Sequence, residues 1–213
     1  MSEELKKLRD DHKDFLGDNL ENPPLCPLSL FSDWFDAAVR GQELESNALC
    51  LSTVGKSGIP SSRIVYLKEM KEETFIFYTN YNSKKGEELD QNPNATMLFF
   101  WPKLQRQVRI TGLVSKISEQ DSDAYFSSRP RESQLGAWAS HQSEILHSRA
   151  ELLSRLTDLA VQFPSDVPRP AHWGGYALLP SEMEFWQGQP SRLHDRVVYE
   201  RFANSWRTIR KNP

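Results

Sequence analysis

The chain has 213 residues, of which 38% are hydrophobic and 26% are charged, with 26 Lys and Arg against 29 Asp and Glu. This composition is typical of a soluble globular protein and excludes a collagen-like or wholly disordered chain. The formal net charge of -3 provides no global positive field, which argues against capture of nucleic acid by charge alone. The two cysteines, Cys26 and Cys50, suit the reducing cytoplasm, where we expect the protein to be located.

The N-terminal segment is interpreted as an arm that precedes a single domain. The first residues are charged and lack the apolar stretch of a signal peptide, and the N-P-P-L-C-P run at 22–27 can continue neither a helix nor a sheet ladder. The strongest apolar run, 97–101, is too short to span a bilayer. We therefore expect an arm at 1–27, flexible or lid-forming, and one domain at 28–213.

The period of the apolar residues changes along the chain. In residues 28–40 apolar side chains recur at helical spacing and Gly41 follows, which predicts one amphipathic helix. Later short β-branched and aromatic runs separated by turn residues predict an antiparallel sheet or barrel, so the fold class is mainly β with flanking helices. The expected strands are 48–54, 63–67, 74–79, 95–101, 105–117, 173–179, 183–187 and 192–199, and the further helices are 83–90, 118–126 and 145–163.

Several common enzyme motifs are absent. The sequence has no G-x-G-x-x-G opening a helix, no G-x-x-x-x-G-K and no G-x-S-x-G, which removes the main support for Rossmann, P-loop and esterase functions. The five histidines show no H-x-x-x-H pair and no flanking cysteines, so we expect no metal site. The acidic pairs Glu72-Glu73 and Glu87-Glu88 are interpreted as solvated faces.

The segment R-L-H-D-R at 192–196 carries three potential cations. If it is a strand, Arg192, His194 and Arg196 share one face, which suits either an anionic or electron-rich ligand or open water. The preceding E-F-W-Q-G run places Trp186 nearby as a flat apolar wall. A flat polar ligand suits that combination.

A second cluster, Y-T-N-Y-N-S-K-K at 78–85, joins a strand end to a helix start. Lys84 and Lys85 in the first helical turn oppose the helix dipole at a cost of ~0.3–1 kcal/mol each, and a bound phosphate reverses that penalty. Backbone N–H groups and the hydroxyls of Thr79 and Ser83 complete an anion cradle. A lysine-rich exposed turn is the alternative.

Two further runs offer polar side chains. Arg63 and Lys68 in S-S-R-I-V-Y-L-K are an odd number of positions apart, so one site can use both only if a bulge or a strand end lies between them. In Q-R-Q-V-R, Gln105, Gln107 and Arg109 share one polar face, and amides there can read the edge of a heteroaromatic ring.

The last cluster is Y-F-S-S-R-P-R-E-S-Q at 125–134. Tyr125 and Arg129 at i,i+4 share a helix face, and Ser133 is expected to cap the next helix. These three side chains are suited to binding a phosphate, and the alternative is an exposed turn between two helices. Taken together, the clusters indicate two anion sites with flat aromatic surfaces. A phosphorylated ring cofactor and a phosphorylated ring substrate would need such a site.

The ordered set of motifs resembles the pyridoxine/pyridoxamine 5′-phosphate oxidase family of vitamin B6 metabolism. From about residue 28 to the C-terminus, the chain carries R-I-V-Y-L-K, F-Y-T-N-Y-N-S-K-K, L-Q-R-Q-V-R, Y-F-S-S-R-P-R-E-S-Q-L-G-A-W-A-S-H-Q-S, H-W-G-G, E-F-W-Q-G and R-L-H-D-R in the family's order. The resemblance implies a split β-barrel homodimer with one FMN per subunit at the dimer interface, where residues of both chains build each site.

The resemblance also implies the reaction and its residues. Pyridoxine 5′-phosphate and pyridoxamine 5′-phosphate would be oxidised by FMN and O2 to pyridoxal 5′-phosphate, with release of H2O2 and, from the amine, NH3. Matching positions give FMN contacts at Arg63, Ile64, Val65, Tyr66, Lys68, Tyr78, Thr79, Lys84, Lys85, Gln107, Gln142, Ser143, Trp186 and Arg196. Substrate contacts fall at Lys68, Tyr125, Arg129, Ser133, Arg192, Leu193 and His194, with Arg9 and His12 from the arm, and Arg192 and His194 are assigned to catalysis.

The sequence departs from the family's pattern at three positions, and it leaves other functions open. Lys84 stands where arginine is usual, which replaces a bidentate fork by a point charge. His12 stands where tyrosine is frequent, and Lys211 changes the usual C-terminal R-L-x-P. The alternatives are a non-catalytic FMN- or B6-phosphate-binding protein on the same barrel and a flavin-reductase-like relative.

Overall fold

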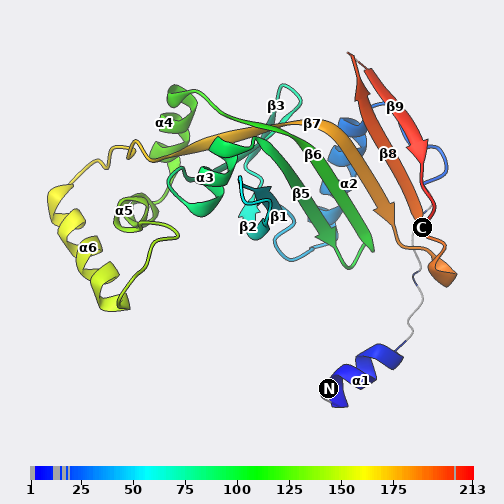
Figure 1. Cartoon of the computed structure of the whole chain (residues 1–213), viewed down its shortest axis with the longest axis horizontal. Helices are drawn as coiled ribbons and strands as arrows, with labels where there is room; N and C mark the ends of the chain where they lie inside the picture. The colour runs from blue at the N-terminus through cyan, green and yellow to red at the C-terminus, as the bar shows by residue number, and fades with distance from the viewer. Residues whose placement is uncertain (1–2, 12–14, 16–17, 19, 204) are drawn as a thin grey trace. The chain divides into compact units, whose positions relative to one another are not determined.

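The protein is described by a computed structural model that covers residues 3–11, 15, 18, 20–203 and 205–213 (Figure 1). Its internal contacts form two compact units. Unit 1 comprises Met1–Ser46, Leu98–Ile110 and Glu182–Pro213, and unit 2 comprises Asn47–Met97 and Thr111–Ser181. The expected boundary between an arm at 1–27 and one domain at 28–213 stays a prediction.

The strands form one sheet, and helices lie between them along the chain. Hydrogen bonding orders the strands β2-β1-β5-β6-β7-β4-β3, with β8 paired to β7 and β9 to β8. The elements are α1 (Glu3–Asp10), α2 (Pro27–Arg40), β1 (Ala48–Val54), β2 (Pro60–Tyr66), β3 (Glu69–Lys71), β4 (Thr74–Asn80), α3 (Lys84–Gln91), β5 (Asn94–Trp101), β6 (Arg106–Lys116), α4 (Glu119–Ser128), α5 (Arg131–Ala139), α6 (Arg149–Gln162), β7 (Trp173–Gln187), the 3-10 turn η1 (Pro190–Arg192), β8 (Asp195–Phe202) and β9 (Ser205–Arg210).

Unit 2 is built on antiparallel pairs whose buried faces follow the two-residue period of a strand. In β1 every second side chain is buried, and its partner β2 pairs Leu51 with Arg63. Strand β4 is buried on both faces and pairs with the first half of β7, where Thr79 lies opposite Gly174. Although β2 and β4 are far apart in the strand order, residues of both line one cavity.

The helices of unit 2 cover a separate aromatic cluster. Phe126 of α4, Leu135 of α5 and Trp173 at the start of β7 are buried against one another. Residues from α6, among them Leu156 and Leu159, pack on the same cluster, and Figure 1 shows α5 and α6 side by side. This cluster fixes the α4–α5 elbow over the start of β7.

Unit 1 has its own aromatic core. The amphipathic helix α2 buries Phe31 and Trp34, and the Phe31 ring lies 5.1 Å from that of Phe99. Trp34 packs edge-on against Phe185 of β7, with ring centroids 5.3 Å apart. The second half of β7 pairs with β8, which sets Trp186 opposite Arg196.

The predicted mainly β fold with flanking helices is confirmed, and two predicted elements are wrong at their N-terminal ends. Strand β8 begins at Asp195, because residues 190–192 form a 3-10 turn instead of extended chain. Helix α6 begins at Arg149 after its N-cap Ser148, so Ile145 lies outside it with 86% of its surface exposed. No helix in the described part of the chain is long and apolar enough to cross a membrane.

A substitution at Gly86 tests how closely α3 packs against the backbone of Tyr81. A Cβ at this position would lie 1.9 Å from the backbone oxygen of Tyr81, so Gly86→Ala requires backbone movement. We expect Gly86→Ala to lower the unfolding free energy by ~1–3 kcal/mol, measured by urea denaturation. The matched control is Gly136→Ala in α5, where an added Cβ meets nothing within 4 Å and helix propensity favours alanine. Equal stability of the two variants would contradict this account of α3.

Candidate functional site

Two adjoining cavities lie in unit 2, each with a volume of about 610 Å³. Both are lined by Tyr66, Lys68, Tyr78, Thr79 and Gln142, so they meet along this shared wall. The cavity that we call the arginine cavity is further lined by Asn80, Tyr125, Arg129, Pro130, Ser133, Gly136, Ala137, Ser140 and Trp173. The one that we call the lysine cavity is further lined by Ser61, Ser62, Arg63, Ile64, Val65, Lys84, Lys85 and Ser143.

The lysine cavity contains the N-terminus of α3. Ser83 occupies the N-cap position as predicted, although its hydroxyl donates to the Asn80 carbonyl at 2.6 Å instead of capping the helix. Lys85 is buried and donates to Thr79 Oγ1 at 3.0 Å, to Ser83 Oγ at 2.9 Å and to Gln142 Oε1 at 2.6 Å. Burial, with the nearby charge of Arg63, lowers the pKa of Lys85 from 10.5 to about 8. An anion in this cavity would offset that penalty.

Arg63 reaches the same cavity from β2 and is tied to a buried carboxylate. Its guanidinium lies 3.3 Å from Glu88 Oε2, and the same oxygen accepts hydrogen bonds of 2.6 Å from Thr53 and Ser61. Burial alone would raise the pKa of Glu88, but the two hydroxyls and the charge of Arg63 lower it below its ordinary value. Glu88 is therefore ionised and fixes Arg63.

The expectation that Glu87-Glu88 forms a solvated face is wrong for Glu88, which is only 7% exposed. The buried residues of α3 include Lys85, Glu88 and Leu89. This i, i+3, i+4 spacing from Lys85 to Leu89 marks the inner face of the helix, and the apolar Leu89 could have revealed it from the sequence.

Arg129 and Lys68 are the cationic side chains that line the arginine cavity among the described residues. Arg129 follows the last residue of α4, and its guanidinium carbon lies 4.5 Å from the centroid of the Trp173 ring. Burial lowers the pKa of Arg129, and its Nη1 atom is buried without a hydrogen-bond partner among the described residues. A buried N–H group without a partner carries a free-energy cost that an anionic ligand would remove.

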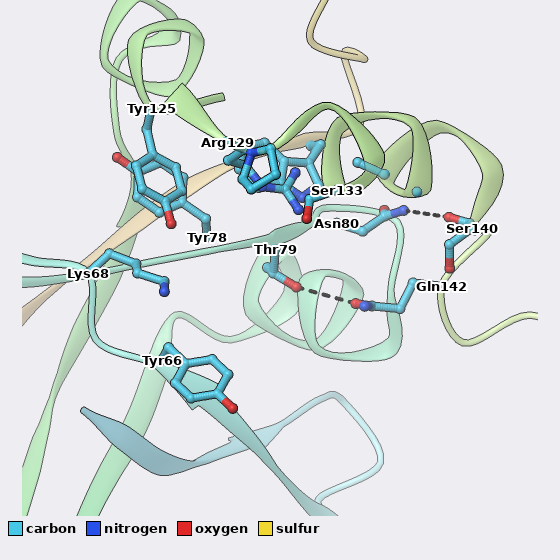
Figure 2. Close-up of a pocket in the computed structure, with 14 residues that line it drawn as sticks. Tyr66, Lys68, Tyr78, Thr79, Asn80, Tyr125, Arg129, Ser133, Ser140 and Gln142 are labelled. Carbon is cyan, nitrogen blue, oxygen red and sulfur yellow. Dashed lines mark hydrogen bonds between the residues drawn. The ribbon is translucent and has the colours of Figure 1, made fainter. Parts of the chain in front are cut away.

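Figure 2 shows Tyr125, Arg129 and Ser133 along one side of the arginine cavity, with Tyr66 across from them. The elbow differs from its predicted form in two respects. Helix α4 ends at Ser128, so Arg129 lies at the C-cap and not on a continuous helix face with Tyr125. Helix α5 has Pro130 at its N-cap, so Ser133 is within the first turn and does not cap the helix.

Three nearly parallel rings line the arginine cavity. The Tyr78 ring lies 3.8 Å from that of Tyr125 and 5.5 Å from that of Trp173, at interplanar angles of 18° and 14°. Burial, helped by the charges of Glu69 and Tyr125, raises the pKa of Tyr78 to about 12. The Tyr78 hydroxyl therefore stays protonated at neutral pH and can donate a hydrogen bond.

The ends of β2 and of α5 complete the shared wall. Strand β2 ends at Tyr66, so Arg63 and Lys68 line one cavity because a strand end lies between them. Lys68 stands 5.0 Å from the centroid of the Tyr66 ring. On the other side, the hydroxyl of Thr79 donates to Gln142 Oε1 at 3.3 Å, and Asn80 donates to the Ser140 carbonyl at 3.4 Å (Figure 2).

In unit 1 a buried carboxylate organises two arginines. Glu184 is 2% exposed and accepts from Arg109 at 2.6 Å and from Arg196 at 3.0 Å. The predicted polar face of Gln105, Gln107 and Arg109 is only partly formed, because Gln105 precedes β6 and has a φ of 55°.

The R-L-H-D-R segment does not place three cations on one strand face. Arg192 is in the 3-10 turn with a φ of 61°, and Ser191 before it has a φ of 56°, a left-handed backbone that costs ~1–3 kcal/mol per residue. His194 follows the turn, and its Nδ1 accepts a hydrogen bond of 3.1 Å from the backbone N–H of Gln189. The neutral ring therefore carries its proton on Nε2. The His194 ring lies 4.7 Å from that of Trp186.

The predicted site residues divide between the two units. Those of unit 2 all line the two cavities, with the predicted flavin contacts in the lysine cavity and Lys68, Tyr125, Arg129 and Ser133 in the arginine cavity. Gln107, Trp186, Arg192, Leu193, His194, Arg196 and Arg9 belong to unit 1, and His12 lies outside the described residues. Sequence reasoning missed Glu88 and Trp173 as parts of the site.

The fold and the paired cavities define a mainly β protein of the split-barrel class with two adjoining cavities, each lined by cationic side chains. Residues 35–162 match the family model described as pyridoxamine 5′-phosphate oxidase, and residues 173–213 match the pyridoxine 5′-phosphate oxidase C-terminal dimerisation region. The chain belongs to the pyridoxamine 5′-phosphate oxidase family and carries its dimerisation region.

Relatives and solved structures agree with this assignment. Proteins of Burkholderia thailandensis and Burkholderia mallei named pyridoxine/pyridoxamine 5′-phosphate oxidase are each 51% identical over 88% of this chain and 89% of their own length. PhzG from Burkholderia lata, solved with tetrahydrophenazine-1-carboxylic acid, is 33% identical with a TM-score of 0.87, covering 94% of this chain and 98% of PhzG. An FMN-binding protein of Nostoc punctiforme shares the fold, with 19% identity and a TM-score of 0.71 over 89% of this chain and 98% of that one.

The lowered pKa of Lys85 predicts a pH dependence of stability. In the ligand-free protein the folded state binds fewer protons than the unfolded state between pH 8 and 10.5, so this lysine makes stability rise with pH across that window. We expect the urea midpoint of Lys85→Met to lack the wild-type rise from pH 8 to 10.5. Lys84→Met, at a side chain that is 63% exposed, should parallel the wild type. If the urea midpoints of Lys85→Met and the wild type change with pH in parallel, the pKa of Lys85 is not lowered by burial.

Proposed function

We propose that the protein oxidises pyridoxine 5′-phosphate and pyridoxamine 5′-phosphate to pyridoxal 5′-phosphate, with FMN as cofactor and O2 as oxidant. The observation that carries this proposal is the pair of adjoining cationic cavities, each sized for a small molecule, in a chain of the oxidase family. Two anion sites that share a wall suit two phosphorylated ring compounds in contact. The homodimer and the position of FMN at its interface, with one per subunit, belong to the same proposal.

The lysine cavity fits the phosphate of FMN. Lys85 is buried with a lowered pKa, and Arg63 presents a guanidinium held by Glu88. Backbone N–H groups at the start of α3 add hydrogen-bond donors. We assign the FMN phosphate to this cradle and the flavin ring to the wall formed by residues 64–66. The contacts of Gln107, Trp186 and Arg196, which belong to unit 1, rest on the family resemblance alone.

The arginine cavity fits the phosphate of the substrate. Arg129 offers a buried donor with no protein partner, and Lys68, Tyr125 and Ser133 line the same cavity. A tetrahedral dianion can accept from all four side chains, and each charge-assisted hydrogen bond adds ~1.5–3 kcal/mol. These contacts hold the substrate in a fixed orientation, which is the main contribution of the protein to the rate.

When bound, FMN would accept a hydride from the 4′ carbon of the substrate and pass both electrons to O2, giving H2O2. In the proposal, Arg192 and His194 bind the pyridine ring and its substituents, an assignment that rests on the family resemblance. His194 carries its proton on Nε2 in the neutral form and can donate it in a hydrogen bond. With pyridoxamine 5′-phosphate, hydrolysis of the oxidised product releases NH3. Arg9 and His12 keep the role of a lid in the proposal.

A second candidate function is oxidation of a reduced tricyclic carboxylic acid. The observation that favours it is the likeness to PhzG, which was solved with tetrahydrophenazine-1-carboxylic acid. A carboxylate would use fewer of the donors in the arginine cavity than a phosphate does, so the geometry favours the phosphorylated substrate. The non-catalytic FMN- or B6-phosphate-binding protein remains the third candidate.

The experiment that tests the proposal follows aldehyde and peroxide together. The purified protein is loaded with FMN, its visible spectrum is recorded, and pyridoxine 5′-phosphate, pyridoxamine 5′-phosphate or tetrahydrophenazine-1-carboxylic acid is added in air. Equal amounts of aldehyde and H2O2 from either B6 phosphate support the oxidase. Peroxide only with the tricyclic acid supports the second function, and a bound flavin without turnover supports the binding protein.

Arg129→Met tests the substrate phosphate site. We expect KM for pyridoxine 5′-phosphate to rise roughly 10- to 150-fold, the equivalent of one charge-assisted contact of ~1.5–3 kcal/mol. The Kd of FMN should stay within about twofold, because Arg129 lines only the arginine cavity. Steady-state kinetics and flavin fluorescence measure the two effects. An unchanged KM would remove Arg129 from the site.

A further inference from the structure

We propose that Trp173 is a positioning residue that holds the guanidinium of Arg129 in the orientation required to bind the substrate phosphate. The inference rests on the proposed function, because it assigns to Trp173 a role at the phosphate site of that reaction. It concerns how the arginine is held and not whether a phosphate binds.

Arg129 is held differently from Arg63 and Arg196, two other arginines that the proposal places near ligands. Arg63 and Arg196 each pair with a buried carboxylate, Glu88 and Glu184 respectively. Among the described residues no carboxylate pairs with Arg129. Its guanidinium carbon instead lies 4.5 Å from the centroid of the Trp173 ring and 5.5 Å from that of Phe126.

An aromatic face and a carboxylate have different consequences for a ligand. A carboxylate accepts the N–H groups of arginine and neutralises its charge, so it competes with an incoming phosphate. An aromatic face attracts the flat guanidinium through its quadrupole and leaves the N–H groups along the edge free. The buried Nη1 of Arg129, which has no partner in the described chain, is such a free donor.

Trp173 is itself fixed at several points. Its backbone N–H donates to the Pro170 carbonyl at 3.0 Å, and its backbone carbonyl accepts from Arg169 Nη1 at 2.7 Å. Arg169 is paired at 2.6 Å with Asp123 of α4, the helix that leads into Arg129. One short network therefore ties the backbone of Trp173 to the helix that leads into the arginine, which is the support that a preorganised anion site needs.

The same ring also aligns a second predicted phosphate ligand. The plane of Tyr125 is within 4° of that of Trp173, with ring centroids 6.2 Å apart. The next residue, Gly174, lets Tyr81 approach, because a Cβ there would lie 2.1 Å from the Tyr81 hydroxyl. The start of β7 is thus held close to Tyr81, which leaves the backbone next to Trp173 little freedom to shift.

The experiment compares Trp173→Leu, which removes the aromatic face, with Trp173→Phe, which keeps a weaker one. We expect Trp173→Leu to raise KM for pyridoxine 5′-phosphate about tenfold, while kcat stays within about threefold. Trp173→Phe should recover most of the wild-type KM. Trp138→Leu is the matched control, because Trp138 packs on the same aromatic cluster, whereas the described cation–π contacts of Arg129 are with Phe126 and Trp173. It should lower the melting temperature as Trp173→Leu does and leave KM unchanged.

A double-mutant cycle separates positioning from a general loss of structure. Inorganic phosphate is titrated into the FMN-loaded wild type, Trp173→Leu, Arg129→Met and the double variant, with thermal protection as the readout. We expect Trp173→Leu to weaken phosphate binding about tenfold when Arg129 is present and less than twofold in the Arg129→Met background.

Equal weakening in both backgrounds, or a KM change in Trp138→Leu as large as that in Trp173→Leu, overturns the inference. If the wild type turns over neither B6 phosphate, the proposed function fails instead. The phosphate cycle still decides in that case whether Trp173 acts through Arg129.

Discussion

Buried positive charge in unit 2 is the constraint on which the site depends. Lys85, Arg63 and Arg129 are removed from water to different degrees, and desolvation of a cation costs several kcal/mol unless a partner compensates for it. Glu88 compensates for part of this charge beside Lys85 and Arg63. The remaining positive charge is available to a ligand, so the lining of both cavities favours anionic ligands.

The protein holds its cations in three ways, and each suits a different task. Arg63 is fixed by an ion pair with Glu88, which holds the guanidinium in one orientation but partly neutralises its positive charge. Lys85 is held by two hydroxyls and an amide, which leave its charge intact, while burial and the nearby charge of Arg63 lower its pKa. Arg129 lies on an aromatic face, which leaves both its charge and its N–H groups free. The arginine with the least compensation is therefore the one that needs a ligand most.

The sequence was sufficient to predict most of the strands and many of the unit 2 residues that line the cavities, because the strand period and the motifs can be recognised from local sequence. It was insufficient where a residue's surroundings come from distant segments. The burial of Glu88 depends on Thr53 and Ser61, which precede it by 35 and 27 positions, and nothing local shows their approach. The turn at 190–192 replaces predicted strand because Ser191 and Arg192 adopt left-handed backbone, which their residue types do not suggest.

The two units differ in how their charges are balanced. In unit 1, Glu184 accepts from both Arg109 and Arg196, so that cluster is largely neutralised within the protein. In unit 2 only Glu88 serves Arg63 and the α3 lysines, and Arg129 has no acidic partner among the described residues. Because a ligand stabilises the state that binds it, an anion bound in unit 2 relieves a cost that the ligand-free fold carries. The stability of unit 2 is thereby linked to occupancy of its cavities, whereas the charge cluster of unit 1 is satisfied by the chain itself.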